Sequence, residues 1–566
     1  MLKMSPTSAA AVCFLLLLFC TCVSPQCRTA MEDECQDHQD FVPGHGLAGV
    51  GFDITKLERK AAKVLDMSKW QKEDGTCILC QNPLMDGKPL QRLPLAVADW
   101  EAKVECQKNL RSSIQVSGIS VIQGAGSNVN NDWKVGLDVQ VKPQTNVQVA
   151  LAGSHSKIAD FSMEKSSQDQ YTFVSHEVSC SYYSLRVGHR RKLTEHFTHA
   201  LKNLPPKYNH GTRLEYRQLI GTYGTHWITH LRLGGRMKDV TATRVCETVL
   251  DGVTADEVKD CLSLEASASI GNSKADASYK TCQELKKKQN FKGSFHNTYK
   301  ERHTEVVGGK SHMDLLFSSD QNTESFKEWV EGLKSLPDLL SYSLEPIHTL
   351  VPKDHPQRET LRQAVSEYVT ERVLWRNCTH PCPPETTRSP RDPCSCVCHS
   401  NGLTDSMCCS RKRGQGKLTV TIQRAHNLWG DYITSTDAYV KVFYQGKQSQ
   451  TSTIWNNNNP IWKSHFDLGI VQVLGETSKL KIQVWDEDNR YDDDLLGSCD
   501  FTLQAGKPVS TVCYLNHGSL LFQYQLVCGP YLGGPYCLDY APQQPKYAGA
   551  LLQRKGKADS VTPRAP

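Results

Sequence analysis

Apolar and polar side chains alternate along residues 261–300, near the middle of the chain. Five apolar residues alternate with serine and glutamate in the first half: Leu262, Leu264, Ala266, Ala268 and Ile270. Three lysines at 286–288 indicate a turn, after which residues 291–300 alternate again. Each arm has about the nine to eleven residues that a tilted transmembrane strand requires. The pattern predicts a β-hairpin, and an ordinary antiparallel sheet with one solvated face is the alternative.

An earlier tract, residues 147–187, combines two periods. Its first apolar residues alternate with polar or small ones, as in a strand: Val147, Val149 and Leu151. Farther along, Ile158 and Phe161 have the spacing of one face of a short helix, and strand-like alternation resumes after residue 170. Two periods in one segment indicate that it can pack as helix in one state and as strand in another.

A glycine-containing motif lies between the two tracts. It consists of Tyr223, Gly224, Thr225, His226 and Trp227, followed after six residues by Gly234 and Gly235. A glycine pair inside strand-like sequence marks a bend or a close backbone approach. The motif resembles the signature of the membrane-attack-complex/perforin family, with Trp227 where that family usually has Phe or Tyr. A buried bend in an unrelated sheet is the alternative.

This resemblance implies a bent central sheet and two flanking segments that leave the sheet to enter a membrane. The flanking segments are the alternating tracts described above. A further stretch, residues 355–376, has apolar residues at helical spacing and predicts an amphipathic helix that closes the domain by packing.

The N-terminus and the composition narrow the class of protein. Residues 1–24 have the pattern of a secretory signal peptide, with an apolar run too short to span a bilayer. No other run of eighteen apolar residues occurs, so we expect the mature chain to be secreted or stored in granules. A net charge of +5 on 566 residues is too small to indicate binding to nucleic acid.

The cysteines indicate disulfide bonds. Three of the 23 cysteines fall in the signal peptide, so an even number remains in the mature chain. An even number of cysteines in an exported chain predicts disulfide bridges. The spacing of the cysteines does not determine which of them pair. Cys77 and Cys80 have the spacing of a redox motif, but with Cys27 and Cys35 nearby two structural bridges are favoured. Four more cysteines, at 499, 513, 528 and 537, are expected to be bridged near the C-terminus.

Seven cysteines crowd into 32 residues from Cys378 to Cys409. So short a segment has no core of its own and needs cross-links. It resembles the EGF-like module that follows the pore-forming domain in this family, and a zinc site is the alternative. Because the number is odd, at least one cysteine is expected to pair outside the module. Asn377 begins the one glycosylation sequon found.

Residues 413–500 change to strand-like sequence with acidic loops. Their order resembles a C2 domain, an eight-stranded β-sandwich that binds calcium in loops at one end. The resemblance assigns the metal ligands Asp431, Asp437, Asp486, Asp488 and Asp494, and adds Asp493 as a plausible one. Calcium takes six to eight oxygen ligands, so several carboxylates must converge on it. An EF-hand is excluded because no glycine occupies the sixth position that an EF-hand loop requires. A solvated acidic loop without a metal is the alternative.

Aromatic residues lie among these carboxylates. They are Trp429, Tyr432 and Tyr491. Amphipathic rings are stable at a membrane interface, so we expect these side chains to contact lipid headgroups once calcium has neutralised the aspartates. Packing at the base of the loops is the alternative.

The predicted fold class is α+β, with a bent antiparallel central sheet, two flanking helical or hairpin segments, a small disulfide-rich module and an all-β sandwich. The predicted boundaries are a signal peptide (1–24), a pore-forming domain (25–376), the EGF-like module (377–412), the C2 domain (413–500), and a disulfide-containing extension with a tail (501–566).

The resemblance implies a cytolytic protein, not an enzyme, that is secreted from the granules of cytotoxic lymphocytes and binds the phospholipid membrane of a target cell through calcium. Many copies would form a ring whose pore admits granule proteases. Physical reasoning supports the ring, because two hairpins give four strands per chain, whereas small transmembrane barrels need about eight, and open edges in lipid are costly.

Rival functions fit the sequence less well. A phospholipase would be expected to carry a Gly-x-Ser-x-Gly elbow, and none occurs. The Gly-Lys-Ser sequence at 309–311 fails as a phosphate-binding loop because Thr304 stands where glycine is needed. A non-lytic, calcium-dependent lipid-binding or adhesion protein remains the alternative.

Overall fold

A computed structural model describes most of the chain: residues 26–139, 148–271, 276–288, 293–310, 315–317, 323–377, 381–382, 384, 386–390, 396–430, 432–488 and 492–544. Several predicted features lie outside these residues: the signal peptide, Val147, residues 291–292 of the second arm, Cys378 and Cys394 of the disulfide-rich module, the loop residues Asp431 and Tyr491, and the C-terminal tail from 545. Only the backbones of Val149 and Asn377 are described.

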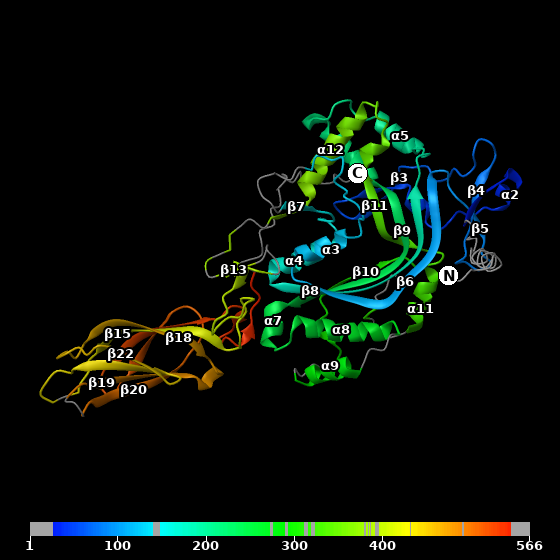
Figure 1. Ribbon diagram of the computed structural model, residues 1–566. Coiled ribbons are helices and arrows are strands. Elements are labelled where there is room, and N and C mark those ends of the chain that lie inside the picture. Colours follow the sequence, from blue (N-terminus) through cyan, green and yellow to red (C-terminus); the bar gives the residue numbers. More distant parts are fainter. Residues whose placement is uncertain are drawn as a thin grey trace, which may run out of the picture.

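Seven antiparallel strands form the central sheet, which curves strongly along its length (Figure 1). Its path runs through β3 (Glu58–Lys63), β2 (Val50–Asp53), β9 (His226–Arg244), β8 (Tyr171–Val187) and β6 (Val97–Gln115). Two further strands, β11 (Asp338–Pro346) and β10 (Arg302–Val307), both pair with β9. The predicted bent antiparallel sheet is therefore confirmed.

The glycine pair lies where β9 changes partner, between its pairing with β11 and its pairing with β10. A Cβ on Gly234 would lie 1.9 Å from the carbonyl oxygen of Cys180, and one on Gly235 would lie 2.3 Å from Leu333 Cδ2. The opposing strand β8 has a register shift between Ser181 and Tyr183 at this point. Close backbone approach and a bulge thus occur together in the strongly curved sheet.

Two groups of helices flank the sheet. The first contains α3 (Gly118–Gly126) and α4 (Lys157–Gln168), and the second contains α8 (Ala255–Ser269), α9 (Asp276–Lys288) and α10 (Phe295–Thr298). Helix α8 packs on β6 and β8 below the bend (Figure 1). Helix α11 (Thr323–Gly332) buries Trp329 beside the bend.

The strand predicted across residues 262–270 is wrong for this state, because α8 is helical. Leu262, Ala266 and Ile270 are four residues apart, so they share one helix face as well as one strand face, and all three are buried. Where the structure describes the arm predicted at 291–300, the strand is also wrong for this state, because Phe295–Thr298 form α10. Residues 171–187 do not leave the sheet, since they form β8.

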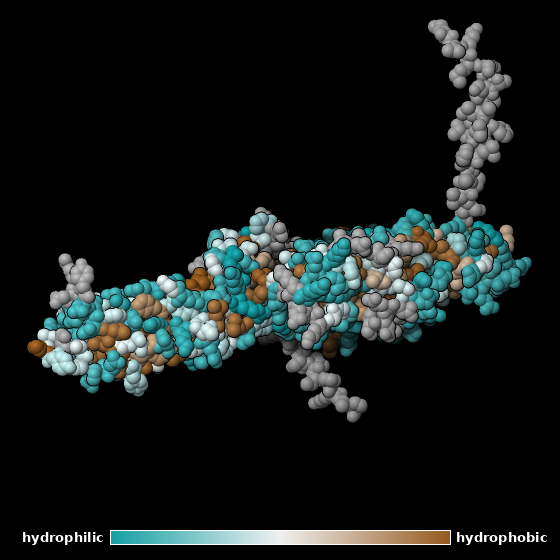
Figure 2. Space-filling view, turned by 90° about the horizontal axis from the view of Figure 1, so that it is seen from below, coloured by the Kyte–Doolittle hydropathy of each residue, from teal (hydrophilic) through white to brown (hydrophobic). Residues whose placement is uncertain are grey.

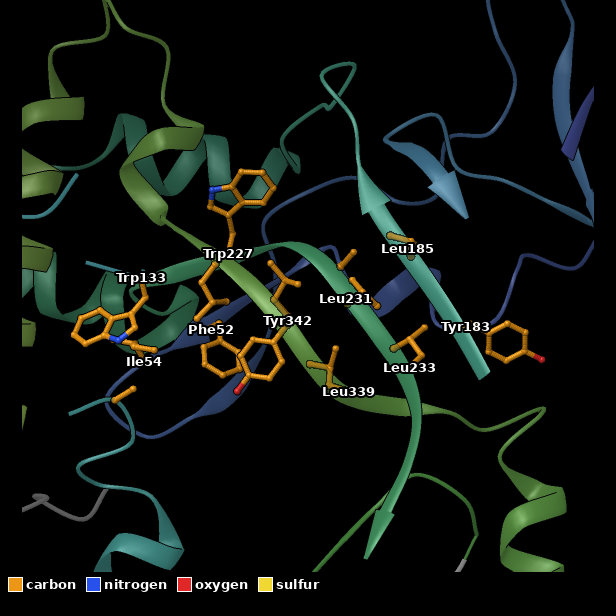
Figure 3. Packing of buried hydrophobic residues seen from close by; sticks show 14 of the residues in the cluster. Phe52, Ile54, Trp133, Tyr183, Leu185, Trp227, Leu231, Leu233, Leu339 and Tyr342 are labelled. Atoms are coloured by element: carbon orange, nitrogen blue, oxygen red, sulfur yellow. The ribbon is translucent and has the colours of Figure 1, made fainter. Parts of the chain in front are cut away.

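The predicted closing helix is present as α12 (Gln357–Arg372), with Leu361, Val365 and Val369 buried. It packs on α6 (Arg213–Tyr223). A large core lies between these helices and the sheet, and Figure 3 shows Trp227, Leu231 and Leu233 of β9 in it with Tyr342 and Leu339 of β11. Further α-helices among the described residues of the domain are α2 (Glu32–Asp37), α5 (Glu195–Lys202) and α7 (Val245–Leu250).

A small three-stranded sheet stands at the N-terminal side, made of β1 (Cys27–Ala30), β4 (Cys77–Gln81) and β5 (Leu90–Arg92). Disulfides join Cys27 to Cys80 and Cys35 to Cys77. The two structural bridges predicted in place of a redox motif are confirmed.

The sandwich has eight strands in two sheets and lies at one end of an elongated molecule (Figures 1 and 2). One sheet contains β18 (Ile461–Gln472), β15 (Gln415–His426), β22 (Ser519–Cys528) and β21 (Val509–Tyr514). The other contains β17 (Lys447–Gln450), β16 (Ala438–Tyr444), β19 (Lys479–Asp486) and β20 (Asp494–Thr502). The predicted end at residue 500 is wrong, because β21 and β22 complete the first sheet.

Short elements lie between the two parts, and disulfides cross-link this region and the sandwich itself. These elements are β13 (Thr386–Arg388), β14 (Cys396–Cys398), β23 (Leu532–Gly533) and β24 (Asp539–Tyr540). Disulfides join 382 to 396, 398 to 408, 499 to 513 and 528 to 537. Cys409 pairs with Cys246 of α7, in the domain of the central sheet, which confirms that one cysteine pairs outside the module.

Candidate functional site: a helical segment on a bent sheet and an acidic loop end

The signature motif fastens the start of β9 to β2. The N–H of Thr225 donates to Phe52 O at 2.9 Å, and its hydroxyl accepts from the N–H of Ile54 at 3.0 Å. Gly224 has a positive φ of 82°, and a Cβ there would lie 2.5 Å from the carbonyl oxygen of Phe52. The motif is therefore a structural joint that tolerates no side chain at this glycine.

His226 is wholly buried within this joint. Its Nε2–H donates to Trp133 O at 2.9 Å, so Nδ1 is left to accept from the hydroxyl of Thr225 at 2.8 Å. Burial lowers the pKa of His226 to about 4, although the bond to Trp133 opposes the shift. A neutral histidine held on both sides by hydrogen bonds is a packing residue here.

Helix α8 places polar residues against the sheet. The hydroxyl of Ser263 lies 2.7 Å from that of Ser112 on β6 and 3.1 Å from Nε2 of His176 on β8. Ser267 and Ser269 are buried as well, whereas Leu264 is half-buried and Ala268 is exposed. A helix that meets the sheet through hydroxyl groups buries less apolar area there than a leucine-rich face would.

Glu265 joins the three helices of the second segment. Its carboxylate accepts from the N–H groups of Phe295 and His296 at 2.8 and 3.0 Å, and from Lys286 Nζ at 3.2 Å. Burial raises the pKa of Glu265, but the hydrogen bonds from His296 and Phe295 and the charge of Lys286 outweigh it and lower the pKa overall. The alternating pattern placed Glu265 on the polar face of a predicted strand and did not reveal that it joins three helices.

The first segment is anchored by a short strand pair. Strand β7 (Gln148–Leu151) pairs with β12 (Leu374–Asn377), and Leu151 packs with Ile122 of α3 and Leu374. The predicted helical face is present in α4, where Ile158 and Phe161 pack on β8. This segment is thus helical between two strands in the structure.

The acidic loops meet at the outer tip of the sandwich, where β15 ends and β16 begins. Asp486, the last residue of β19, is 1% exposed and accepts from the N–H of Asp437 at 2.6 Å. Asp494 lies directly opposite Asp486 in the register of β20. A Cβ on Gly430 would lie 1.7 Å from Asp486 Oδ2, so the first loop closes over this carboxylate.

The other predicted ligands that the structure describes make hydrogen bonds of their own or are exposed. Asp437 Oδ1 accepts from the N–H of Asn456 at 2.5 Å, and Asp493 Oδ2 accepts from the hydroxyl of Tyr439 at 2.6 Å. Burial, together with that bond to Asp493, raises the pKa of Tyr439. Asp488 follows β19 in the third loop and is exposed.

These residues fit a hard cation. A buried carboxylate such as Asp486 is costly unless it is paired with a charge or a metal, and calcium prefers oxygen ligands. Among the described residues, no three such side chains converge tightly enough to hold a metal as they stand. One of the assigned ligands, Asp431, lies outside those residues.

Apolar and aromatic side chains project from the same loops, and apolar atoms protrude at the outer tip of the sandwich in Figure 2. Tyr432 is 91% exposed and Ile433 96% exposed, while Trp429 stacks edge-on against Tyr432 with ring centroids 5.0 Å apart. Trp455, in the loop after β17, is also exposed. Sequence analysis missed Ile433 and Trp455, although both lie within four residues of acidic or asparagine-rich loop positions.

A covalent and polar junction connects this sandwich to the domain of the central sheet. The Cys246–Cys409 disulfide starts at α7, and Arg413 pairs with Asp251 at 2.8 Å just after that helix. The hydroxyl of Tyr540 on β24 donates to the buried carboxylate of Asp169 at 2.6 Å. Asp169 caps the end of α4, so the junction contacts the end of the first helical segment and the chain just before α8.

Comparison with known proteins matches three successive parts of the chain to family models. A MAC/Perforin domain matches residues 44–376, a Perforin-1-like EGF domain matches 377–411, and a C2 domain matches 416–515. The chain belongs to the MAC/Perforin family. Human Perforin-1 is 47% identical over 91% of this chain and 93% of its own, and rat Perforin-1 is 48% identical over 94% and 97%.

The rabbit complement component C8 alpha chain is more distant within the MAC/Perforin family, at 23% identity over 60% of this chain and 62% of its own. Family membership together with the C2 domain makes the chain a cytolytic pore-forming protein. MAC/Perforin proteins act on membranes and oligomerise, and they are pore-forming proteins, not enzymes. In the described part of the chain, no helix is long and apolar enough to cross a membrane.

Proposed function

We propose that the sandwich binds calcium and then the phospholipid of a target cell, after which many copies assemble into a ring and insert two β-hairpins each. The protein would be secreted from cytolytic granules, and the pore would admit granule proteases. Helix α8 carries this proposal, because its sequence alternates like a strand while it is folded as a helix against the sheet.

At the membrane-binding end, Asp431, Asp437, Asp486, Asp488, Asp493 and Asp494 would hold calcium. Bound calcium would neutralise these carboxylates and could bridge to lipid phosphates. Trp429, Tyr432 and Tyr491 would then lie among the headgroups, together with Ile433. The chain's own contribution is to hold Asp486 buried and to present its apolar side chains outward.

At the inserting end, polar residues of α8 would line water and Leu262, Leu264, Ala266, Ala268 and Ile270 would meet lipid. Val147, Val149 and Leu151 would do so in the first hairpin. Unpaired strand edges in hydrocarbon cost several kcal/mol per group, so neighbouring subunits must pair their edges. Assembly therefore precedes or accompanies insertion.

A cross-link between α8 and the sheet tests this proposal. The side-chain oxygens of Ser112 and Ser263 are 2.7 Å apart, so a Ser112→Cys/Ser263→Cys variant should form a disulfide that holds α8 on β6. We expect the oxidised variant to bind liposomes with calcium and release no dye. The Ser112→Ala/Ser263→Ala variant, which lacks the cross-link, should release dye.

Dye release also separates the rival function. A non-lytic adhesion protein binds liposomes without leakage in every variant. Leakage by the fully cross-linked protein would contradict insertion of α8, whereas recovery of leakage after mild reduction, under conditions that leave the wild type unchanged, would support it.

A further inference from the structure

We propose that the disulfide between Cys261 and Cys282 sets the strand register of the second inserted hairpin and places its turn at Gly271 and Asn272. The inference rests on the proposed function, because it concerns the inserted form of the same segment. In the structure the bond joins α8 to α9, and both cysteines are buried.

The bond suits both the helical and the strand arrangement. Its two Cα atoms are 5.6 Å apart. Facing residues of antiparallel strands have Cα atoms about 4.5–5.5 Å apart, so the bond can remain intact while the helices convert to strands. A bond that survives conversion fixes which residues face each other, because Cys261 and Cys282 must stay opposite.

The turn follows from that constraint. In an antiparallel pair, the residue that follows Cys261 faces the residue that precedes Cys282, and so on along both strands. Continuing this pairing brings Ile270 opposite Ser273 and leaves two residues between them for the turn. These are Gly271 and Asn272, a dipeptide typical of two-residue hairpin turns. Gly271 already has a positive φ of 78° at the end of α8, as such a turn requires.

The same register sorts the side chains by polarity. One face pairs apolar or small uncharged residues: Leu262 with Thr281, Leu264 with Tyr279, Ala266 with Ala277, Ala268 with Ala275, and Ile270 with Ser273. The other face holds every charged residue of the two arms: Ser263 with Lys280, Glu265 with Ser278, Ser267 with Asp276, and Ser269 with Lys274. The register was taken from the disulfide alone, so the separation of polarity is independent evidence against a slip by one residue, which would move every side chain of one arm to the other face.

The length of the apolar face also fits a membrane. The next pair on that face below Leu262 and Thr281 is polar, Asp260 with Gln283. The apolar face therefore spans nine residues in each arm, about what a tilted transmembrane strand requires.

This register replaces the arm predicted at residues 291–300. The three lysines at 286–288 then lie at the base of the hairpin and not at its tip. Residues 295–298, which form α10, lead into β10 of the central sheet and need not enter the membrane.

Two neighbouring residues of α9 provide a matched test. Tyr279 is 54% exposed and Lys280 is exposed in the helical state, so aspartate at either position should leave the water-soluble form folded. The register places Tyr279 on the lipid face and Lys280 on the water-filled face. We therefore compare Tyr279→Asp and Lys280→Asp in the full-length protein on phosphatidylcholine liposomes with calcium.

We expect Tyr279→Asp to bind like the wild type and to release dye at least ten-fold more slowly. Lys280→Asp should release dye within two-fold of the wild type, and its pores should shift towards cation selectivity in planar bilayers. Equal release by the two variants, or loss only in Lys280→Asp, would overturn the register. Wild-type protein that binds without leakage would instead overturn the proposed function itself.

Discussion

Nδ1 of His296 donates a hydrogen bond of 2.9 Å to the carboxylate of Glu265, across 31 residues of chain. The bond joins α10 to α8, and Lys286 of α9 donates to the same carboxylate. A single acidic side chain thus holds the second segment in its helical arrangement. Any conversion to strands must first break these contacts.

Replacing Glu265 should loosen this arrangement. We expect Glu265→Gln to lower the free energy of unfolding by about 1–3 kcal/mol, because hydrogen bonds to a charged group are lost. Thermal unfolding measures the loss, and dye release should begin at lower protein concentration. Glu328→Gln on the exposed face of α11 is the control. An unchanged melting temperature would show that Glu265 does not hold the helices.

Acid should destabilise the joint at His226. Its pKa in the folded state is about 4, against about 6.5 unfolded, so below pH 6.5 the unfolded chain binds the proton and the folded chain does not. Stability attributable to this group is therefore present above pH 6.5 and is lost between pH 6.5 and 4. Between pH 7 and 5 the loss is about 2 kcal/mol.

Chemical denaturation at the two pH values checks this expectation. In a His226→Gln variant, which cannot take up the proton, the difference between pH 7 and pH 5 should shrink by that amount. Burial also lowers the pKa of His348 to about 4, so some acid sensitivity should persist in the variant. An identical pH dependence in both proteins would rule out His226 as the cause.

Adding a methyl group at Gly234 should destabilise the bend in the central sheet. Gly234→Ala would bring a Cβ to 1.9 Å from the backbone of Cys180, which cannot rotate away as a side chain can. We expect a loss of stability of about 1–3 kcal/mol or failure to be secreted. Gly221→Ala, in helix α6 with no atom within 4 Å of the new Cβ, should be neutral or stabilising by up to about 1 kcal/mol. Equal effects at both positions would contradict this account of the bend.

Removing one buried carboxylate should uncouple membrane binding from calcium. We expect Asp486→Asn to fold, because the amide oxygen can still accept from the N–H of Asp437, and to lose calcium-dependent sedimentation with liposomes. Asp500→Asn, exposed at the other end of β20, is the matched control. Normal calcium dependence in Asp486→Asn would remove this residue from the site.

The protruding isoleucine should contribute to membrane affinity. Burying an isoleucine side chain is worth about 1.5–3 kcal/mol, so Ile433→Ala should weaken liposome binding about ten-fold. Ile470→Ala, on an exposed position of β18 away from the loops, should change nothing. Because Ile433 is 96% exposed, the substitution should leave the unfolding temperature unchanged. Equal affinity of the two variants would place the lipid contact elsewhere.

Much of the fold could be predicted from local pattern. The glycine pair marked the bend because no other residue fits there, and the spacing of Leu361 and Val365 predicted α12. Helix α8 was predicted as a strand because Leu262, Ala266 and Ile270 satisfy both periods at once. Local spacing cannot distinguish a helix from a strand when the same residues satisfy both periods.

The features that the local sequence pattern did not predict depend on contacts between residues far apart in the chain. Strand β22 was omitted from the sandwich because its partner β15 lies about a hundred residues earlier. The role of Glu265 depends on His296, and the register of the hairpin depends on which cysteine pairs with Cys261. Neither partner can be read from sequence distance alone.

The Cys246–Cys409 bond has a mechanical consequence. It anchors the sandwich side of the molecule to α7, which leads directly into α8. If the loops at the outer tip bind a membrane, as proposed above, force on the sandwich would be transmitted through this bond to α7 and then to the start of α8. The disulfide would thereby couple binding at one end of the molecule to unfolding of the second helical segment at the other.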